Sequence, residues 1–165
     1  MNDYPARANF FDASALTKLF SSEYDSEELI EYFNNCSPTK FTTPFCLYET
    51  LNILKSKWKH RNSLSKEQYL EASLKLIAWY RGNTKQVRDL DFTDPLIFLK
   101  TKDLANKYDL DLSDAFQILT LKEGEYSFFI NDSVTLFITA DRDLAIAAAE
   151  EGIKSWYCMN GRAPK

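Results

Sequence analysis

Four acidic residues stand where a folded chain would bring their carboxylates together. Asp12 follows one short apolar run, and Asp141 follows another. Glu49 lies two turns into a predicted helix, and Asp114 lies at the start of a further one. In an open parallel α/β sheet the working site lies beyond the carboxyl ends of the strands. The pattern therefore predicts that these four side chains converge at one edge of a sheet.

An all-oxygen group of this kind favours a particular chemistry. Hard divalent cations take oxygen ligands, and a cation offsets the mutual repulsion of several carboxylates, so the set predicts a site for Mg²⁺ or Mn²⁺. Such an ion can activate water and stabilise the leaving oxygen of a phosphodiester. Because hydrolysis then needs no protein nucleophile, the predicted reaction is phosphodiester cleavage.

Each acid also has an interpretation that involves no chemistry. Asp114 and Asp141 are typical of helix N-termini, where a carboxylate caps the helix and meets its dipole. Glu49 projects opposite the apolar stripe of its helix, which is typical of a solvated face. Asp12 is different, because a carboxylate at the end of a buried aromatic strand is costly unless hydrogen bonds or a cation meet it.

Two neighbouring acids fit the same alternatives. Asp143 lies in the first turn predicted after Asp141, and Asp111 precedes Ser113, which is predicted to cap its helix. Both acids are interpreted first as helix-start residues, and support of the four-acid site is their second interpretation.

Cysteine, histidine and glycine positions exclude other chemistries. Cys36, Cys46 and Cys158 are widely spaced and form no CxxC motif, which indicates reduced thiols and a cytoplasmic protein. A Cys/His zinc site lacks ligands because His60 is the sole histidine. The basic run around His60 is predicted to be an exposed helix end, which argues against a Ser-His-Asp triad. The 4 glycines lie too far apart for a phosphate-binding loop.

Length and composition are those of a single globular domain covering residues 1–165. The chain is 45% hydrophobic and 27% charged, which is ordinary for a protein that buries its own core. A net charge of -4 argues against a surface that attracts nucleic acid or membranes everywhere. The longest apolar run, residues 144–149, is too short to span a membrane, and the first residues do not resemble a secretion signal.

Apolar spacing predicts strands that alternate with helices. Strands are expected at residues 8–12, 40–43, 89–92, 134–139 and 153–157, and helices at 14–20, 26–35, 43–59, 65–80, 94–108, 113–122 and 141–151. Residues 126–130 are expected to form a hairpin with 134–139 or a loop that leads into it. Alternation of this kind predicts a three-layer α/β/α sandwich around a mostly parallel sheet.

Two details of the predicted helices concern packing and caps. Ser14 and Ser113 are expected to be N-caps. In the helix at 65–80, apolar residues recur at helical spacing and predict its core face: Tyr69, Leu70, Leu74, Ile77 and Ala78.

Over nearly the whole chain, four segments in order resemble the motifs of the PIN-domain ribonucleases, especially the VapC-like toxins of toxin–antitoxin pairs. These segments are Phe10-Phe11-Asp12-Ala13-Ser14-Ala15-Leu16, Tyr48-Glu49-Thr50-Leu51, Leu110-Asp111-Leu112-Ser113-Asp114-Ala115, and Phe137-Ile138-Thr139-Ala140-Asp141-Arg142-Asp143-Leu144-Ala145. The resemblance implies a PIN-like fold and a Mg²⁺- or Mn²⁺-dependent endoribonuclease.

The resemblance also implies roles for individual residues. The catalytic metal ligands would be Asp12, Glu49, Asp114 and Asp141. The supporting residues would be Ser14, Thr139 and Asp143. Its implied partners are an RNA substrate, a second copy in a homodimer, and an antitoxin whose segment covers the acidic site.

Surface contacts with these partners have two interpretations each. Aromatic rings of the first helices either dock the antitoxin or pack in the core: Phe20, Tyr24, Tyr32 and Phe33. Basic residues either contact RNA phosphates or belong to solvated faces: Lys55, Lys57, Lys59, His60, Arg61, Lys85, Arg88, Lys100 and Lys102.

Three alternatives to the toxin remain open. A haloacid-dehalogenase-type phosphatase would need a second Asp at the position of Ser14, which disfavours it. A PIN-like interaction module would be expected to lack some of the acids, and a housekeeping RNA-processing nuclease would keep them all. The chain departs from the family at residues 123–133, which are longer and more aromatic than the usual short turn, and their role is open.

Overall fold

The computed structural model describes residues 8–21, 23, 25–36, 39–125, 127 and 135–163, and for residues 83–86 it describes the backbone alone. The expected pairing of residues 126–130 falls almost entirely outside the described residues. So does Tyr24.

A central parallel sheet carries the fold. Its strands are β1 (Ala8–Phe11), β2 (Thr39–Thr42), β3 (Thr84–Gln86), β4 (Thr135–Thr139) and β5 (Ser155–Tyr157). They lie in the order β3-β2-β1-β4-β5, and every neighbouring pair is parallel. Parallel strands need crossover connections, and helices supply them here.

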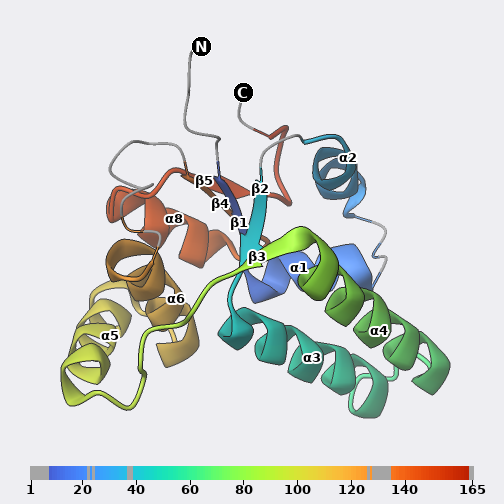
Figure 1. Cartoon of the computed structure of the whole chain (residues 1–165), viewed down its shortest axis with the longest axis horizontal. Coiled ribbons are helices and arrows are strands. Elements are labelled where there is room, and N and C mark those ends of the chain that lie inside the picture. The colour runs from blue at the N-terminus through green and yellow to red at the C-terminus, as the bar shows by residue number, and fades with distance from the viewer. Residues whose placement is uncertain are drawn as a thin grey trace.

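Helices cover both faces of the sheet, which confirms the predicted three-layer α/β/α sandwich. They are α1 (Ala13–Phe20), α2 (Glu27–Asn35), α3 (Pro44–Lys59), α4 (Lys66–Asn83), α5 (Pro95–Tyr108), α6 (Leu112–Glu123) and α8 (Arg142–Glu150). Figure 1 shows α5, α6 and α8 on one side of the strands and α1 to α4 on the other. None of the described helices is both long and apolar enough to cross a membrane.

The strand order creates a switch point between β1 and β4. From β1 the chain winds outward through β2 to β3, and it then crosses back to build β4 and β5 on the other side. Helices that leave neighbouring strands in opposite directions open a crevice at their carboxyl ends. The residues that follow β1 and β4 are Asp12 and Ala140-Asp141.

Aromatic side chains fill the core on both faces of β1. Phe10 packs on Phe137 with ring centroids 6.0 Å apart. On the other face Phe11 meets Phe33 at 5.4 Å and Trp79 at 6.4 Å. Asp12 directly follows this buried strand, and 1% of its surface is exposed.

Two predicted N-caps are wrong by two residues. Asp12, not Ser14, caps α1 by accepting the backbone N–H of Ala15, and Asp111, not Ser113, caps α6 by accepting that of Asp114. Asp and Ser are similarly good caps, so sequence alone does not separate candidates two positions apart. The shift leaves Ser14 and Ser113 inside the first helical turns, where their hydroxyls are available to other side chains.

The strand predicted at residues 89–92 is also wrong, because the chain pairs with β2 at 84–86 and has left the sheet by residue 89. There the Asp89 carboxylate accepts the backbone N–H of Phe45 at 2.8 Å, and Asp91 accepts that of Thr93 at 2.9 Å. Side-chain acceptors of this kind favour turns and helix starts over ladder pairing.

Of the five residues predicted for the core face of α4, Tyr69 is confirmed, because it is partly buried and packs against the core, and the other four are wrong. Leu70, Leu74 and Ile77 are exposed, as is Ala78. The buried face consists of Ala72, Leu76, Trp79 and Tyr80. Both sides of this helix carry apolar residues, and periodicity does not tell which side meets the sheet.

Candidate functional site

Asp12 is a buried carboxylate held by three neighbours. One oxygen accepts the backbone N–H of Ala15 at 2.8 Å, and the other accepts the hydroxyl of Thr139 at 2.7 Å. The hydroxyl of Ser14 lies 2.9 Å from both oxygens. Burial nevertheless outweighs these bonds and raises the pKa of Asp12 to about 7.

Ser14 and Thr139 also fasten the end of β1 to the end of β4. Ser14 Oγ accepts the backbone N–H of Ala140 at 2.8 Å, and Thr139 Oγ1 accepts that of Asp141 at 2.9 Å. The two hydroxyls lie 3.1 Å apart. This geometry gives both residues a positioning contact with Asp12, as expected of supporting residues.

Asp141 is the N-cap of α8. Its Oδ1 accepts the backbone N–H of Leu144 at 3.0 Å. The predicted role of Asp141 at a helix start is therefore correct for this oxygen. Asp143 lies exposed in the first turn of the same helix, and within the described residues it makes none of the hydrogen bonds of this group. The structure therefore gives Asp143 no contact through which to support Asp12 or Asp141.

Glu49 is held from across the chain by α6. Its Oε1 accepts the hydroxyl of Ser113 at 3.0 Å, and its Oε2 accepts the amide of Gln117 at 3.0 Å. Burial raises the pKa of Glu49, and the negative charge of Asp111 raises it further. The interpretation that Glu49 lies on a solvated face of its helix is wrong. The side of α3 that carries Glu49 packs toward α6, which supplies two hydrogen-bond donors one turn apart.

Asp114 lies in the first turn of α6. Asp111 is the N-cap of this helix, so the Asp114 carboxylate is not needed as a cap. Its pKa is raised to about 8, first by burial and then by the charges of Asp111, Asp141, Asp12 and Glu49. The charged groups that act most strongly on Asp114 are thus all carboxylates. The charges of the other three acids singled out from sequence, and that of Asp111, therefore all act on Asp114.

The oxygen donors of these acids suit a hard cation, but the side chains do not lie close enough together to hold one ion. In the described part of the chain, no three side chains of the His, Cys, Asp and Glu types lie close enough together to hold one ion as they stand. The donors are nevertheless all oxygen, and burial together with neighbouring carboxylates disfavours the negative charge on Asp114. The chemistry of these oxygen donors suits a hard divalent cation such as Mg²⁺ or Mn²⁺.

Two residues that hold Glu49 or its helix were not singled out from sequence. Gln117, with 3% of its surface exposed, donates to Glu49 and accepts the thiol of Cys46 at 3.5 Å. Asp89 accepts the backbone N–H of Phe45 in the first turn of α3, the helix that carries Glu49. The available signal was Gln117 itself, a polar residue four positions after Ser113 in the otherwise apolar run 115–119.

Of the basic residues considered for RNA contact, three have partners in the described part of the chain, one of them Lys59, whose ammonium lies 4.5 Å from the centroid of the Trp58 ring. Lys57 forms an ion pair with Glu23, and Lys100 pairs with Glu123 at 2.6 Å. Lys55, Lys59 and the other described members are exposed. The side chain of Lys85 lies outside the described residues.

The rings considered for antitoxin docking pack within the molecule. Phe20 and Phe33 contact each other at 6.4 Å between centroids, and Tyr32 meets Trp156 edge-on at 5.1 Å. The core interpretation holds for these three.

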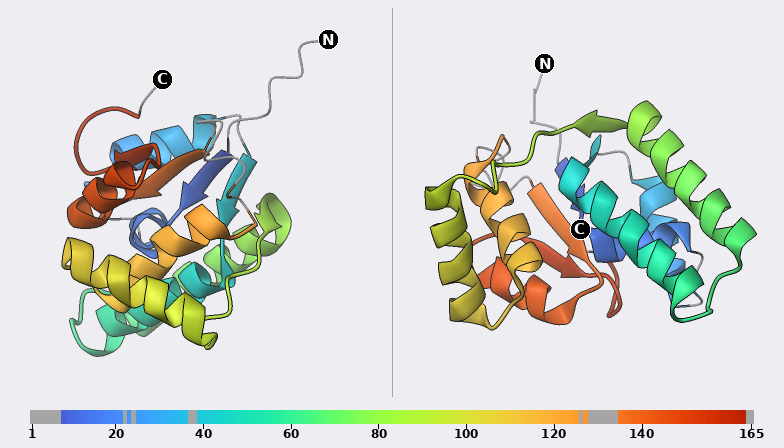
Figure 2. Two further views of the ribbon diagram at one scale, coloured as in Figure 1. Left: turned by 90° about the vertical axis from the view of Figure 1, so that its left-hand side faces the viewer. Right: turned by 90° about the horizontal axis from the view of Figure 1, so that it is seen from below.

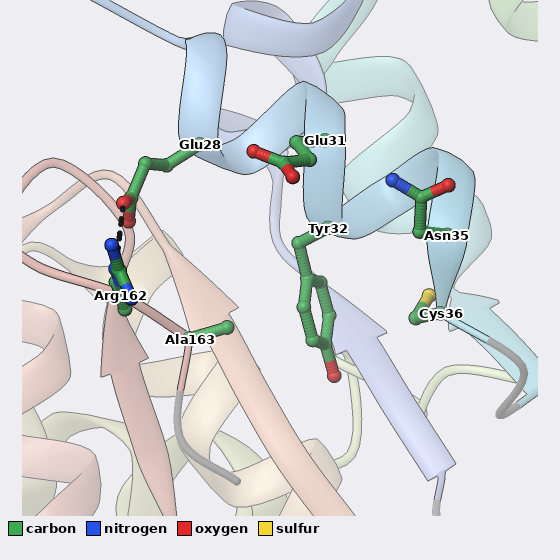
Figure 3. Close-up of a pocket in the computed structure, with 7 residues that line it drawn as sticks. All are labelled: Glu28, Glu31, Tyr32, Asn35, Cys36, Arg162 and Ala163. Carbon is green, nitrogen blue, oxygen red and sulfur yellow. Dashed lines mark ion pairs between the residues drawn. The ribbon is translucent and has the colours of Figure 1, made fainter.

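A cavity of about 550 Å³ lies away from the acids, between α2 and the C-terminal segment (Figure 3). Its lining residues are Glu28, Glu31, Tyr32, Asn35, Cys36, Arg162 and Ala163. Tyr32 points inward, where its hydroxyl donates to Asn9 at 2.9 Å.

Comparison with known proteins identifies the fold alone. No family model matches the chain, and no curated protein matches it. A solved structure, that of PAE2754 from Pyrobaculum aerophilum, is similar with a TM-score of 0.56 and 19% sequence identity. The likeness covers 92% of this chain and 90% of that one, so it extends over the whole sandwich.

Proposed function

We propose that this protein is a Mg²⁺- or Mn²⁺-dependent endoribonuclease that hydrolyses RNA phosphodiester bonds. The observation that supports the proposal is that the charges of Asp12, Glu49 and Asp141 all act on Asp114, while Asp12 and Asp141 follow the neighbouring strands β1 and β4. Buried carboxylates that repel one another are costly, and a divalent cation offsets that cost.

The same four acids would hold the ion. A bound Mg²⁺ or Mn²⁺ would supply Lewis-acid stabilisation and a more acidic water. Side chains of the protein would then orient the carboxylates of Asp12 and Glu49. Ser14 and Thr139 fix both oxygens of Asp12, and Ser113 with Gln117 fixes both oxygens of Glu49.

The resemblance to VapC-like toxins supports a role in a type II toxin–antitoxin pair. On this proposal the protein acts in the cytoplasm on RNA, as a homodimer, and a cognate antitoxin covers the acidic site. A housekeeping nuclease that matures RNA would use the same acids, and the neighbouring reading frame would distinguish the two. A small adjoining gene for a DNA-binding antitoxin favours the toxin.

One observation favours a second candidate, a PIN-like interaction module. In the described residues no three ligands are already placed to hold an ion. A module of this kind would keep the fold and bind a partner without cleaving RNA.

A cleavage assay with a binding readout separates these functions. Purified protein is incubated with labelled RNA in Mn²⁺, in Mg²⁺ and in EDTA, beside Asp114→Asn and the matched control Asp103→Asn on the exposed face of α5. We expect cleavage only with metal, its loss in Asp114→Asn and its retention in Asp103→Asn. Thermal melts should show stabilisation of the wild type by Mn²⁺, about 2.7 kcal/mol at a hundredfold excess over its Kd.

Cleavage that continues in EDTA would rule out the metal-dependent mechanism. Absence of cleavage with every divalent ion, and of stabilisation by Mn²⁺, would leave the interaction module as the better proposal.

A further inference from the structure

Helix α3 carries a row of exposed side chains that begins beside Glu49. The row, named the α3 stripe, consists of Tyr48, Asn52, Lys55 and Lys59, all of them exposed. Spacings of four, three and four residues align them along one side of the helix. Tyr48 directly precedes Glu49, so the stripe starts about a quarter turn around the helix from that carboxylate.

The α3 stripe leads from the acids to the margin of the molecule. In Figure 1 α3 starts near the end of β2 and runs outward along the lower edge, with α4 above it. The view from below shows the same course, with α5 and α6 on the other side of the strands (Figure 2). At a rise of about 1.5 Å per residue, Lys55 and Lys59 lie about 10 and 16 Å along the helix axis from Tyr48.

The charge of this part of the chain is opposite to that of the whole. The chain has a net charge of -4, yet residues 50–66 contain no aspartate or glutamate. Their lysines and arginine are Lys55, Lys57, Lys59, Arg61 and Lys66. Lys57 is engaged with Glu23, whereas in the described part of the chain Lys55 and Lys59 form no ion pair. The stripe therefore offers two ammonium groups to phosphates on a segment free of acids.

Tyr48 gives the α3 stripe an aromatic end. Its side chain is 67% exposed, and it belongs neither to the described core nor to the residues packed against that core. The fold does not use this ring, because the buried side of α3 consists of other residues: Cys46, Leu47, Thr50 and Leu54. Exposed rings next to basic side chains are the parts from which single-stranded nucleic-acid sites are built, since every base has a face that stacks on a ring.

We propose that the α3 stripe binds a single-stranded segment of RNA that continues from the acid site, with a base stacked on Tyr48 and phosphates held by Lys55 and Lys59. Asn52 lies between them with an amide that can donate to phosphate oxygens. The inference rests on the proposed nuclease and adds to it the residues that position the substrate. In a duplex the bases already stack on one another, so only a single strand has a base free for Tyr48.

Binding of single-stranded RNA in EDTA, where the proposed nuclease does not cut, tests the stripe apart from cleavage. Fluorescence anisotropy gives the Kd, and a 2-aminopurine base reports stacking through quenching of its fluorescence. Tyr48→Ala should weaken binding at least about fivefold and reduce the quenching. Tyr48→Phe keeps the ring and should bind within about twofold of the wild type. The matched control Leu96→Ala, at an exposed leucine of α5, should change neither.

Salt dependence tests the two lysines. Each phosphate contact with a single strand contributes about 0.7 to the slope of log Kd against log salt concentration, so Lys55→Ala combined with Lys59→Ala should lower the slope by about 1.4. Tyr48→Ala should leave the slope unchanged. The control Lys154→Ala removes an exposed lysine directly before β5, at the opposite edge of the sheet from the acids, and should also leave it unchanged.

Competition and kinetics test what the ring decides. The same RNA annealed to its complement should compete at least about fivefold less well for the wild type, and Tyr48→Ala should lose most of this preference. In the cleavage assay with Mn²⁺, Tyr48→Ala should raise KM and change kcat little, since the ring binds substrate away from the reacting phosphate. Circular dichroism verifies the fold of each variant.

RNA binding that neither Tyr48→Ala nor the lysine pair weakens would overturn the proposal. So would a duplex that competes as well as the single strand, or cleavage whose KM these variants leave unchanged. RNA binding that depends on the stripe, without cleavage in Mn²⁺ or Mg²⁺, would overturn the proposed nuclease and support the stripe as an RNA-binding surface.

Discussion

Asp12 and Asp114 are held where a negative charge is costly. Burial raises the pKa of Asp12 to about 7 and that of Asp114 to about 8. The ordinary value for both is 3.8, so from about pH 4 to pH 8 the folded chain binds protons more tightly than the unfolded chain does. Stability contributed by these two groups is therefore greatest at low pH and is lost as pH rises through this window.

Asp114→Asn should remove part of the stability loss that the wild type suffers as pH rises. In EDTA at pH 8 the variant should be more stable than the wild type by about 1 kcal/mol, once solvent screening at this partly exposed position is allowed for. For a chain of this size that is a rise in Tm of about 2–4 °C. Because Asp111 is the cap of α6, the substitution leaves capping unchanged.

Thermal melts of both proteins from pH 5 to pH 8.5 check this prediction. The difference should shrink toward pH 5, where Asp114 is protonated in the folded wild type. A variant that is less stable at pH 8 would show that Asp114 is not in a repulsive environment.

Gln117 acts on the site through Glu49. Gln117→Leu keeps the volume of a buried residue and removes the donor to Glu49 Oε2, so Glu49 should lose its fixed orientation. We expect the Mn²⁺ concentration for half-maximal cleavage to rise about tenfold, as for other groups that orient a metal ligand. Cleavage at saturating Mn²⁺ should fall less.

Titrations of Mn²⁺ against cleavage rate check the role of Gln117, with Gln117→Asn as a shorter amide. A lower maximal rate with an unchanged Mn²⁺ requirement would contradict a positioning role through Glu49.

At the scale of elements, three helices on one face of the sheet are tied together by one acid. Glu151, the C-cap of α8, accepts Lys107 and Tyr108 of α5 at 2.7 and 2.5 Å, and it also pairs with Lys122 of α6. These donors lower the pKa of Glu151 to about 2. Since α6 carries Asp114 and α8 begins at Asp141, the contact sets two elements of the site against each other.

Glu151→Gln should weaken this tie. We expect a loss of about 1 kcal/mol at pH 7, because the side chain is nearly buried while solvent screens its lysine partners. A lowered pKa contributes stability that is complete above the ordinary value of 4.5 and lost as pH falls toward 2. Urea unfolding at pH 7 and pH 3 should show the difference between wild type and variant shrinking at the lower pH.

The matched control is Glu71→Gln, which removes an exposed pair with Lys75 within α4. It should change stability little. An equal loss in both variants would show that Glu151 has no special part in joining the helices.

At the scale of the whole molecule, the proposed toxin makes a prediction in cells. Expression of the chain without its antitoxin should arrest growth, and Asp114→Asn expressed at the same level should not. On the proposed function, loss of this one acid would stop RNA hydrolysis and leave the fold intact. Growth curves and RNA integrity after induction measure both effects, with Asp103→Asn as the control that still arrests growth.

Normal growth with protein that is folded and active in vitro would favour a housekeeping nuclease. Growth arrest by Asp114→Asn as well would indicate that toxicity does not come from cleavage.

The sequence by itself determined the alternation of strands and helices and the positions of Asp12, Glu49, Asp114 and Asp141 at strand ends and helix starts. These features follow from local patterns. Apolar residues at strand or helix spacing and Pro44 after the cap Thr43 act over a few neighbouring positions. The sandwich follows from that alternation, because parallel strands need helical crossovers.

The tertiary structure alone decided which side chains meet those acids and which faces are buried. Thr139 reaches Asp12 across 127 positions of sequence, and Gln117 reaches Glu49 across 68. Local propensity carries no information about such partners, because they depend on how the crossovers place β4 beside β1 and α6 beside α3. For the same reason the exposed face of α4 has the periodicity of a core face, and only packing against the sheet shows that its opposite side is buried.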